Sequence, residues 1–110
     1  MKKKVFDKFV EVCETQDWTV HGTHEDKEVE LEKYSPAGED FSITIDLSDV
    51  KESTRSAYDS FDEDDHIEMW IEARKNGVSG VPSTRELVKD ADDIKNMLED
   101  LAIAVAAIKE

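Results

Sequence analysis

The chain has 110 residues, of which 28 are acidic and 14 are basic, so its net charge is −14 at pH 7. This length suits a single domain, residues 1–110, with one hydrophobic core. Direct binding to nucleic acid or to an anionic membrane is not expected, because phosphate contacts need clustered Lys and Arg. The only basic run, Lys2-Lys3-Lys4, is too short for that purpose.

The N-terminal residues predict a cytoplasmic protein. The lysine run is followed by VFDKFVEV, in which charges interrupt the apolar residues, whereas a secretory signal needs an uninterrupted apolar region. No apolar run approaches the roughly 20 residues that a membrane-spanning helix needs. The single cysteine, Cys13, has no partner for an internal disulfide and is expected to be a small buried hydrophobic residue.

The first half of the chain predicts a helix followed by three strands. Residues 3–15 have apolar side chains at the spacing of one helical face, namely Phe6, Phe9, Val10 and Cys13. Apolar and polar residues then alternate in WTVHGT, KEVELEKY and FSITIDL, which predicts a three-stranded antiparallel β-meander with one face on the core. In the connection SPAGED, Pro36 and Gly38 predict a tight turn.

From residue 48 the apolar period returns to about 3.6, which predicts helices. Ser48 is expected to cap the first of them. The second is expected to place Ile67, Trp70 and Ile71 on its core face and to end at Gly77, which can adopt the left-handed conformation.

The last helix begins with a capping-box pattern, Ser83 followed by Glu86. Its apolar positions form a heptad stripe: Leu87, Ala91, Ile94, Leu98, Leu101, Val105 and Ile108. The segment LAIAVAAI has no polar residue, so we expect it to be covered on more than one side, inside a monomer or in a homodimer interface. The order α-β-β-β-α-α-α predicts an α+β domain with the β-meander packed against helices.

The stretch FDEDDHIEMW, residues 61–70, invites a metal-binding or catalytic interpretation. A calcium loop of the EF-hand type that starts at Asp62 would place Ile67 where glycine is needed and Ala73 where a bidentate carboxylate is needed. The three histidines are not paired at a zinc-binding spacing. Neighbouring carboxylates in so acidic a chain do not by themselves indicate a catalytic pair.

A helix start explains the same stretch better. Asp62 is expected to cap the helix, and the three acids after it, Glu63, Asp64 and Asp65, fill a first turn where negative charge is favourable. His66 is then expected to be a partly exposed residue of that turn. Motifs for nucleotides, phosphate loops, zinc proteases and redox dithiols are missing from the sequence. The sequence therefore predicts no catalytic residues, no cofactor and no metal site.

The segments YSPAGEDFSITI and FDEDDHIEMWIEARKNGVSGVPSTRELVKDADDI resemble a group of small, acidic bacterial proteins of about this length. The resemblance covers roughly residues 17–102, and the group has no assigned chemistry. Its members are often encoded near phage-like or other mobile elements, which implies an accessory role in mobile DNA. Members carry proline where Glu63 stands here, and proline is typical of a first helical position.

These observations favour a non-enzymatic protein-interaction module, a monomer or a homodimer through the C-terminal helix. The candidate acidic interaction surface consists of Glu28, Glu30, Glu32, Asp59, Asp62, Glu63, Asp64 and Asp65. Alternating residues on a strand are about 6.6 to 6.8 Å apart, comparable to the phosphate spacing along DNA. A more specific hypothesis is therefore a DNA mimic that inhibits a restriction or CRISPR-type nuclease, with a basic nucleic-acid-binding protein as partner. An enzyme of unknown class is the remaining alternative.

Overall fold

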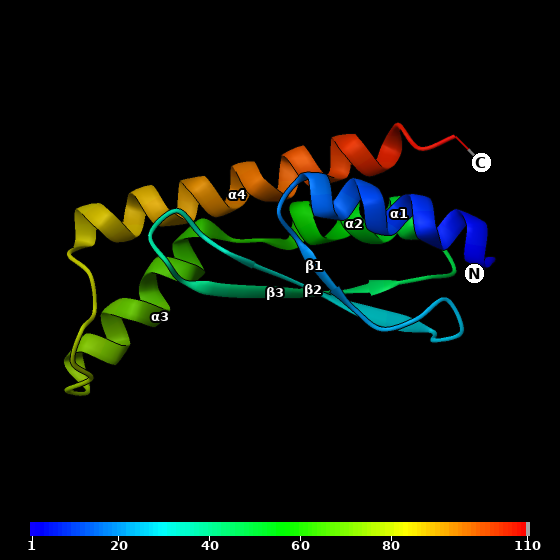
Figure 1. Ribbon diagram of the computed structural model, residues 1–110. Helices are drawn as coiled ribbons and strands as arrows, with labels where there is room; N and C mark the ends of the chain where they lie inside the picture. Colours follow the sequence, from blue (N-terminus) through cyan, green and yellow to red (C-terminus); the bar gives the residue numbers. More distant parts are fainter. Residues whose placement is uncertain (110) are drawn as a thin grey trace.

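The order of helices and strands confirms the predicted α+β fold. The computed structural model describes residues 1–109. Its elements are α1 (Lys3–Thr15), β1 (Thr19–His21), β2 (Glu28–Tyr34), β3 (Asp40–Asp46), α2 (Val50–Ser60), α3 (Glu63–Lys75) and α4 (Thr84–Ala106). Helices α1, α2 and α4 lie on one face of the sheet, and α3 lies at one end of the molecule (Figure 1). Among the described residues, no helix covers the opposite face of the sheet.

A tight reversal joins α1 to the first strand. Asp17 has a φ of 65°, and the N–H of Trp18 donates to the carbonyl oxygen of Cys13 at 3.0 Å. Aspartate adopts this left-handed conformation more readily than most residues, because its short polar side chain bonds locally. The reversal buries Trp18 in the same core cluster as Phe6, Phe9 and Cys13, and the burial of these three residues confirms the predicted apolar face of α1.

The three strands form one antiparallel sheet in the order β1-β2-β3. Val29 and Leu31 of β2 are buried against the helices, whereas Glu28 and Glu30 are exposed on the other side. The predicted alternation is therefore confirmed, and it separates an apolar face from a polar one.

The connection between β2 and β3 is the predicted tight turn. The N–H of Gly38 donates to the carbonyl oxygen of Ser35 at 2.8 Å, which places Pro36 at the first central position, and Gly38 has a φ of 89°. Glu39 closes the turn, because its N–H donates to the Ser35 hydroxyl at 3.1 Å and its carbonyl oxygen accepts from the Ser35 N–H at 2.8 Å. The turn thereby fixes the backbone of Glu39.

The long helix α4 contributes the largest share of the core. Its buried residues are Leu87, Asp90, Ala91, Ile94, Met97, Leu98, Leu101 and Val105. Six of the seven stripe positions are therefore buried within the chain, and Ile108 is half-buried. Within the chain the apolar C-terminal segment is not covered on every side, because Ile103 remains 62% exposed.

The cap of α2 differs from the prediction by one residue. Asp49 is the cap, and its Oδ1 accepts from the N–H of Glu52 at 3.1 Å. Ser48 instead donates its backbone N–H to Oδ1 of Asp46 at 2.8 Å. Both Ser and Asp are good cap residues, so the sequence does not separate them when they are adjacent.

Helices α3 and α4 begin where the sequence predicts. The Asp62 carboxylate accepts from the N–H groups of Asp64 and Asp65 at 2.9 and 3.2 Å. The Ser83 hydroxyl accepts from the N–H of Glu86 at 3.3 Å. Satisfying these N–H groups, which have no partner within the helix, stabilises each helix start by about 1 kcal/mol.

Helix α3 stands apart from the main core. Its predicted core residues Ile67, Trp70 and Ile71 are only half-buried, because among the described helices and strands α4 is the one that packs against α3. None of the helices within residues 1–109 is long and apolar enough to cross a membrane.

Candidate functional site

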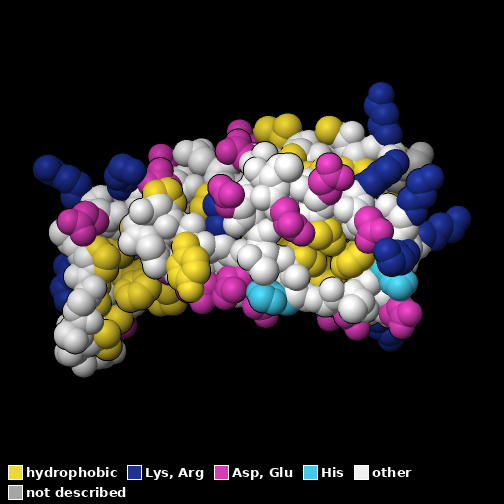
Figure 2. Space-filling view, in the orientation of Figure 1, with side chains coloured by type: hydrophobic (Ala, Val, Ile, Leu, Met, Phe, Trp, Pro, Cys, Tyr) yellow, Lys and Arg dark blue, Asp and Glu magenta, His cyan; other side chains and the backbone are white. Residues whose placement is uncertain are grey.

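The outer face of the sheet carries the predicted row of glutamates. Glu28 and Glu30 are exposed and Glu32 is half-buried, all on the central strand β2. Two aspartates of β3 project from the same side. We call this surface the acidic sheet face, and it consists of Glu28, Glu30, Glu32, Asp40 and Asp46. Figure 2 shows acidic side chains along the lower edge of the molecule, where this face lies.

The strands place no lysine or arginine on the acidic sheet face. Lys33 is the only such residue within the three strands, and its Nζ donates to the carbonyl oxygen of Gln16 at 2.8 Å. This Nζ also lies 5.9 Å from the centre of the Trp18 ring, on the side of the helices. On the outer side, the imidazole Nε2 of His21 lies 3.3 Å from Oε1 of Glu32.

Asp46 keeps its negative charge over a wide pH range. The backbone N–H of Ser48, and then its hydroxyl, donate to the Asp46 carboxylate and lower its pKa below the ordinary value of 3.8. Glu28 lies directly opposite Asp46 in the sheet. Like charges directly opposite one another destabilise a sheet, so this end of the face retains its charge at a cost in stability.

The other predicted surface acids lie at the junction of α2 and α3. Asp62 is engaged as the helix cap, and Oδ2 of Asp59 lies 3.7 Å from Nε of Arg55. Lys95 of α4 reaches the same junction, where its Nζ donates to the carbonyl oxygen of Phe61 at 3.1 Å. These acids, Asp59, Asp62, Glu63, Asp64 and Asp65, therefore belong to a different part of the fold and lie beside basic side chains.

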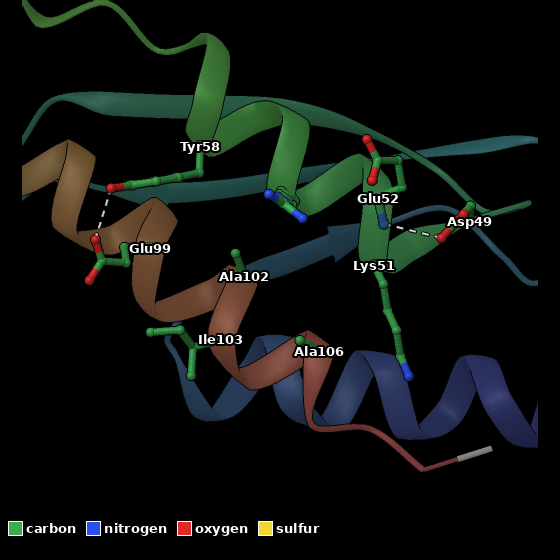
Figure 3. A pocket seen from close by; sticks show the side chains of 9 residues that line it. Asp49, Lys51, Glu52, Tyr58, Glu99, Ala102, Ile103 and Ala106 are labelled. Carbon is green, nitrogen blue, oxygen red and sulfur yellow. Dashed lines mark hydrogen bonds between the residues drawn. The ribbon is translucent and has the colours of Figure 1, made fainter.

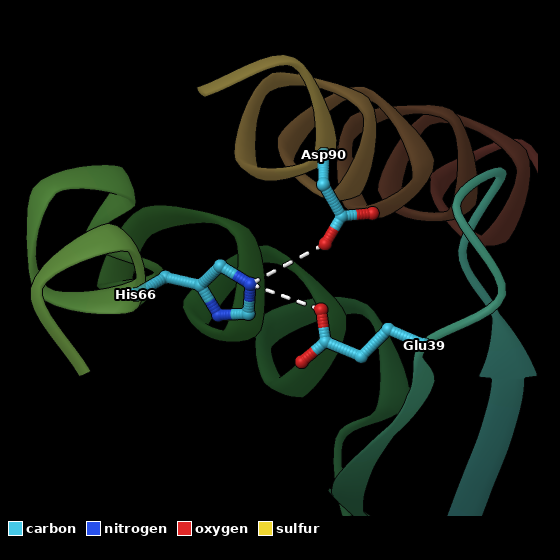
Figure 4. A group of neighbouring side chains, drawn as sticks. All are labelled: Glu39, His66 and Asp90. Atoms are coloured by element: carbon cyan, nitrogen blue, oxygen red, sulfur yellow. Dashed lines mark hydrogen bonds and ion pairs between the residues drawn. The ribbon is translucent and has the colours of Figure 1, made fainter. Parts of the chain in front are cut away.

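A second polar group joins three separate elements at the α3 end of the molecule. Nε2 of His66 lies 3.1 Å from Oε2 of Glu39 and 3.5 Å from Oδ2 of Asp90 (Figure 4). The expectation that His66 is partly exposed is wrong, because its side chain is only 7% exposed. The residue belongs to the first turn of α3 as predicted, but α4 and the β2–β3 turn cover it.

The two carboxylates of this group have opposite pKa shifts. Burial, followed by a hydrogen bond with Asp90, raises the pKa of Glu39, although the charge of His66 opposes the rise. Burial also acts to raise the pKa of Asp90, but hydrogen bonding by Glu39, Ser35 and His66 outweighs it and lowers that pKa. Of the two carboxylates, Asp90 is therefore the stronger acid and Glu39 the weaker.

Asp90 has an unusual environment for an ionised side chain. Its side chain is 5% exposed, and Oδ1 has no hydrogen-bond partner in the described part of the chain. A cavity of about 400 Å³ opens on Glu39 and Asp90, and Trp70, Leu87 and Pro82 form part of its wall. The indole Nε1 of Trp70 donates to Oε1 of Glu39 at 3.3 Å and so orients that carboxylate.

A groove of about 540 Å³ lies between α2 and α4 (Figure 3). Ile103 and Ala106 line it from α4, and Tyr58 closes one end by donating its hydroxyl to Oε2 of Glu99 at 2.9 Å. Charged residues of α2 and its cap also line the groove, namely Asp49, Lys51, Glu52 and Arg55, so only its α4 side is apolar.

Sequence reasoning missed the Glu39–His66–Asp90 cluster. Glu39 precedes His66 by 27 residues and lies in a turn, where glutamate is unremarkable. The local pattern gives no signal for Asp90, because Asp90 and Asp92 both adjoin Ala91 of the apolar stripe and only Asp90 is buried.

Comparisons with protein-family models, with curated proteins and with solved structures find no match to this chain. No relative therefore supplies a function by similarity. The acidic sheet face and the Glu39–His66–Asp90 cluster are the two features from which a function can be inferred.

Proposed function

We propose that the protein is a non-enzymatic interaction module that binds a basic protein partner through the acidic sheet face. The observation that carries this proposal is the composition of that face, which has five carboxylates and no lysine or arginine from the strands. An exposed surface of one charge sign attracts partners of the opposite sign and accelerates their association.

The sheet supports this role because it holds the carboxylates in fixed positions. Three of them alternate along β2, which is hydrogen-bonded on both sides by β1 and β3. A central strand cannot shift without breaking two ladders, so little conformational freedom is lost when a partner binds. The helices cover only the other face, which leaves the row accessible (Figure 1).

A DNA mimic is the more specific form of the proposal. The regular row of Glu28, Glu30 and Glu32 matches the spacing of phosphates along a strand, and basic DNA-binding surfaces are built to recognise such a row. The partner would then be a nuclease of the restriction or CRISPR type. A role near mobile elements is compatible with this partner and is part of the same proposal.

Charge reversal tests the interaction surface. The triple variant Glu28/Glu30/Glu32→Lys is expected to lower the affinity for basic DNA-binding proteins captured from bacterial lysate by more than about tenfold. The matched control is Glu68/Glu72/Asp92→Lys, which changes the net charge equally at exposed helix positions. The measurement is the affinity of each purified variant for the captured and identified partner.

Two results would contradict the proposal. Equal loss in both triple variants would mean that net charge alone drives binding, and no loss in either would remove the sheet face as the interface. A DNA duplex added as competitor tests the mimic: it is expected to displace the protein from its partner. A partner that binds DNA and this protein at the same time would exclude mimicry and leave the interaction module.

A further inference from the structure

The Glu39–His66–Asp90 cluster has the composition of a metal site. One imidazole nitrogen and two carboxylate oxygens come from the β2–β3 turn, α3 and α4, and these ligand atoms all lie within 4.8 Å of one another. Figure 4 shows all three side chains directed toward a common point. Imidazole with carboxylate is a donor set that suits Zn²⁺, Mn²⁺ and Fe²⁺, whereas Ca²⁺ and Mg²⁺ prefer oxygen alone.

The distances agree with coordination. Bonds of about 2.0 to 2.2 Å from Zn²⁺ to nitrogen or oxygen place neighbouring ligand atoms of a tetrahedral site about 3.3 to 3.6 Å apart. Nε2 of His66 lies 3.1 Å from Oε2 of Glu39 and 3.5 Å from Oδ2 of Asp90. Binding of an ion therefore requires these two distances to change by only a few tenths of an ångström.

The charge of the cluster is not balanced by the protein. Within residues 1–109, the salt bridges of Glu39 and Asp90 are formed with His66 alone, and no lysine or arginine takes part. Asp90 is also more than nine-tenths buried, and its Oδ1, the oxygen that does not face His66, has no partner. A buried carboxylate with so few partners costs free energy, and a divalent cation held by Oδ2 would supply the missing positive charge.

The surroundings fit a site with an open position. Trp70 holds Oε1 of Glu39, which leaves Oε2 directed at His66, and the Ser35 hydroxyl fixes the backbone of Glu39. Such outer contacts orient ligands in metal sites. The adjoining cavity of about 400 Å³ gives an ion a route to the carboxylates and room for a water on the fourth position.

We propose that Glu39, His66 and Asp90 bind a divalent first-row transition metal ion. The proposed ion is Zn²⁺, because a site with three protein ligands and one open position suits it. Asp40 of the acidic sheet face lines the adjoining cavity, but Glu28, Glu30 and Glu32 do not. The site and the interaction surface can therefore be tested independently through His66 and Asp90 on the one side and these three glutamates on the other.

Titration of chelator-treated protein with ZnCl₂ tests the site. We expect one Zn²⁺ per chain, binding that persists in excess Mg²⁺, and an affinity that falls more than about 100-fold in His66→Gln and in Asp90→Asn. The matched control is His21→Gln, since Nε2 of His21 also lies 3.3 Å from a carboxylate oxygen but on an exposed surface. This control is expected to bind Zn²⁺ as the parent protein does.

Titration with CoCl₂ gives a readout that needs no variant. A visible absorption band that saturates at one Co²⁺ per chain, together with a Zn²⁺-dependent NMR shift of the His66 Nε2 resonance, would support the site even if His66→Gln fails to fold. Non-saturating binding, undiminished affinity in a folded His66→Gln protein, or shifts at His21 and His24 in place of His66 would overturn the proposal.

Discussion

His66 shows how one buried polar side chain can link distant parts of a small protein. Its Nε2 faces Glu39 and Asp90, and its ring lies 5.5 Å from the ring of Phe61. A buried imidazole without partners would cost free energy, so its polar contacts offset that cost while the ring packs against an aromatic neighbour. One residue thereby attaches α3 to both the sheet and α4.

Cys13 provides a prediction at the scale of a single residue. Burial, and then the charge of Glu14, raise the pKa of its thiol from 9.0 to about 12. Only the thiolate reacts, so at about pH 8 the folded protein is expected to react with a thiol reagent roughly a thousandfold more slowly than the unfolded chain. The measurement is the labelling rate in buffer and in denaturing urea.

The same shift has a consequence for stability. Because the pKa of the thiol is higher in the folded state, the protonated thiol contributes its full stabilisation of the fold below pH 9.0. This stabilisation is lost as the pH rises toward about 12.

The labelling experiment can also contradict the buried position of Cys13. Equal labelling rates in buffer and in urea would show that Cys13 is accessible in the folded state.

At the scale of elements, the cap of α3 can be tested directly. Asp62→Ala removes the acceptor for two N–H groups and is expected to lower the free energy of unfolding by about 1 kcal/mol, or the melting temperature by about 4 to 8 °C. The control is Asp64→Ala, which removes an exposed acid of the same first turn but no cap. Its effect is expected to be less than half as large. Similar losses in both variants would mean that charge, and not capping, stabilises this helix start.

The elements were predictable because each has a local signal. Alternation along β2, the apolar face of α1 and the pattern of Ser83 with Glu86 all depend on neighbours within a few residues. The same locality explains the error at α2, where Ser48 and Asp49 are equivalent as caps until Asp46 engages Ser48.

The cluster was not predictable, since its three residues meet only through tertiary packing. The sequence places His66 in an acidic first turn, which is normally exposed, and gives no indication that Glu39 of a distant turn will cover it. The glutamate row was predictable, because residues two apart on a strand share a face.

At the scale of the whole molecule, the high net charge acts against self-association. The molecule measures 47 × 22 × 21 Å and carries a net charge of −14. Most of the heptad stripe of α4 is used within the chain, which leaves Val88 and Ile103 as the large exposed apolar residues of that helix, and only Ile103 lies in its apolar C-terminal part. We expect sedimentation to give the monomer mass of 12.5 kDa at low salt and also at about 0.5 M NaCl, where repulsion is screened.

The high-salt measurement is the decisive one. A species of twice the monomer mass that appears only when the charges are screened would indicate an apolar interface that repulsion normally prevents. The variant Ile103→Ser would then test whether this residue forms the interface. Because Ile103 is exposed, the substitution is expected to change the free energy of unfolding by no more than about 0.5 kcal/mol.

The alternation in β2 also protects the sheet against slippage. A shift of β2 by one residue relative to its neighbours would exchange its two faces, bringing Val29 and Leu31 into water and forcing Glu28, Glu30 and Glu32 under the helices. Burying three carboxylates among apolar side chains is prohibitive. The glutamates therefore enforce the pairing of the strands that display them, so that mispaired forms of the chain are excluded during folding.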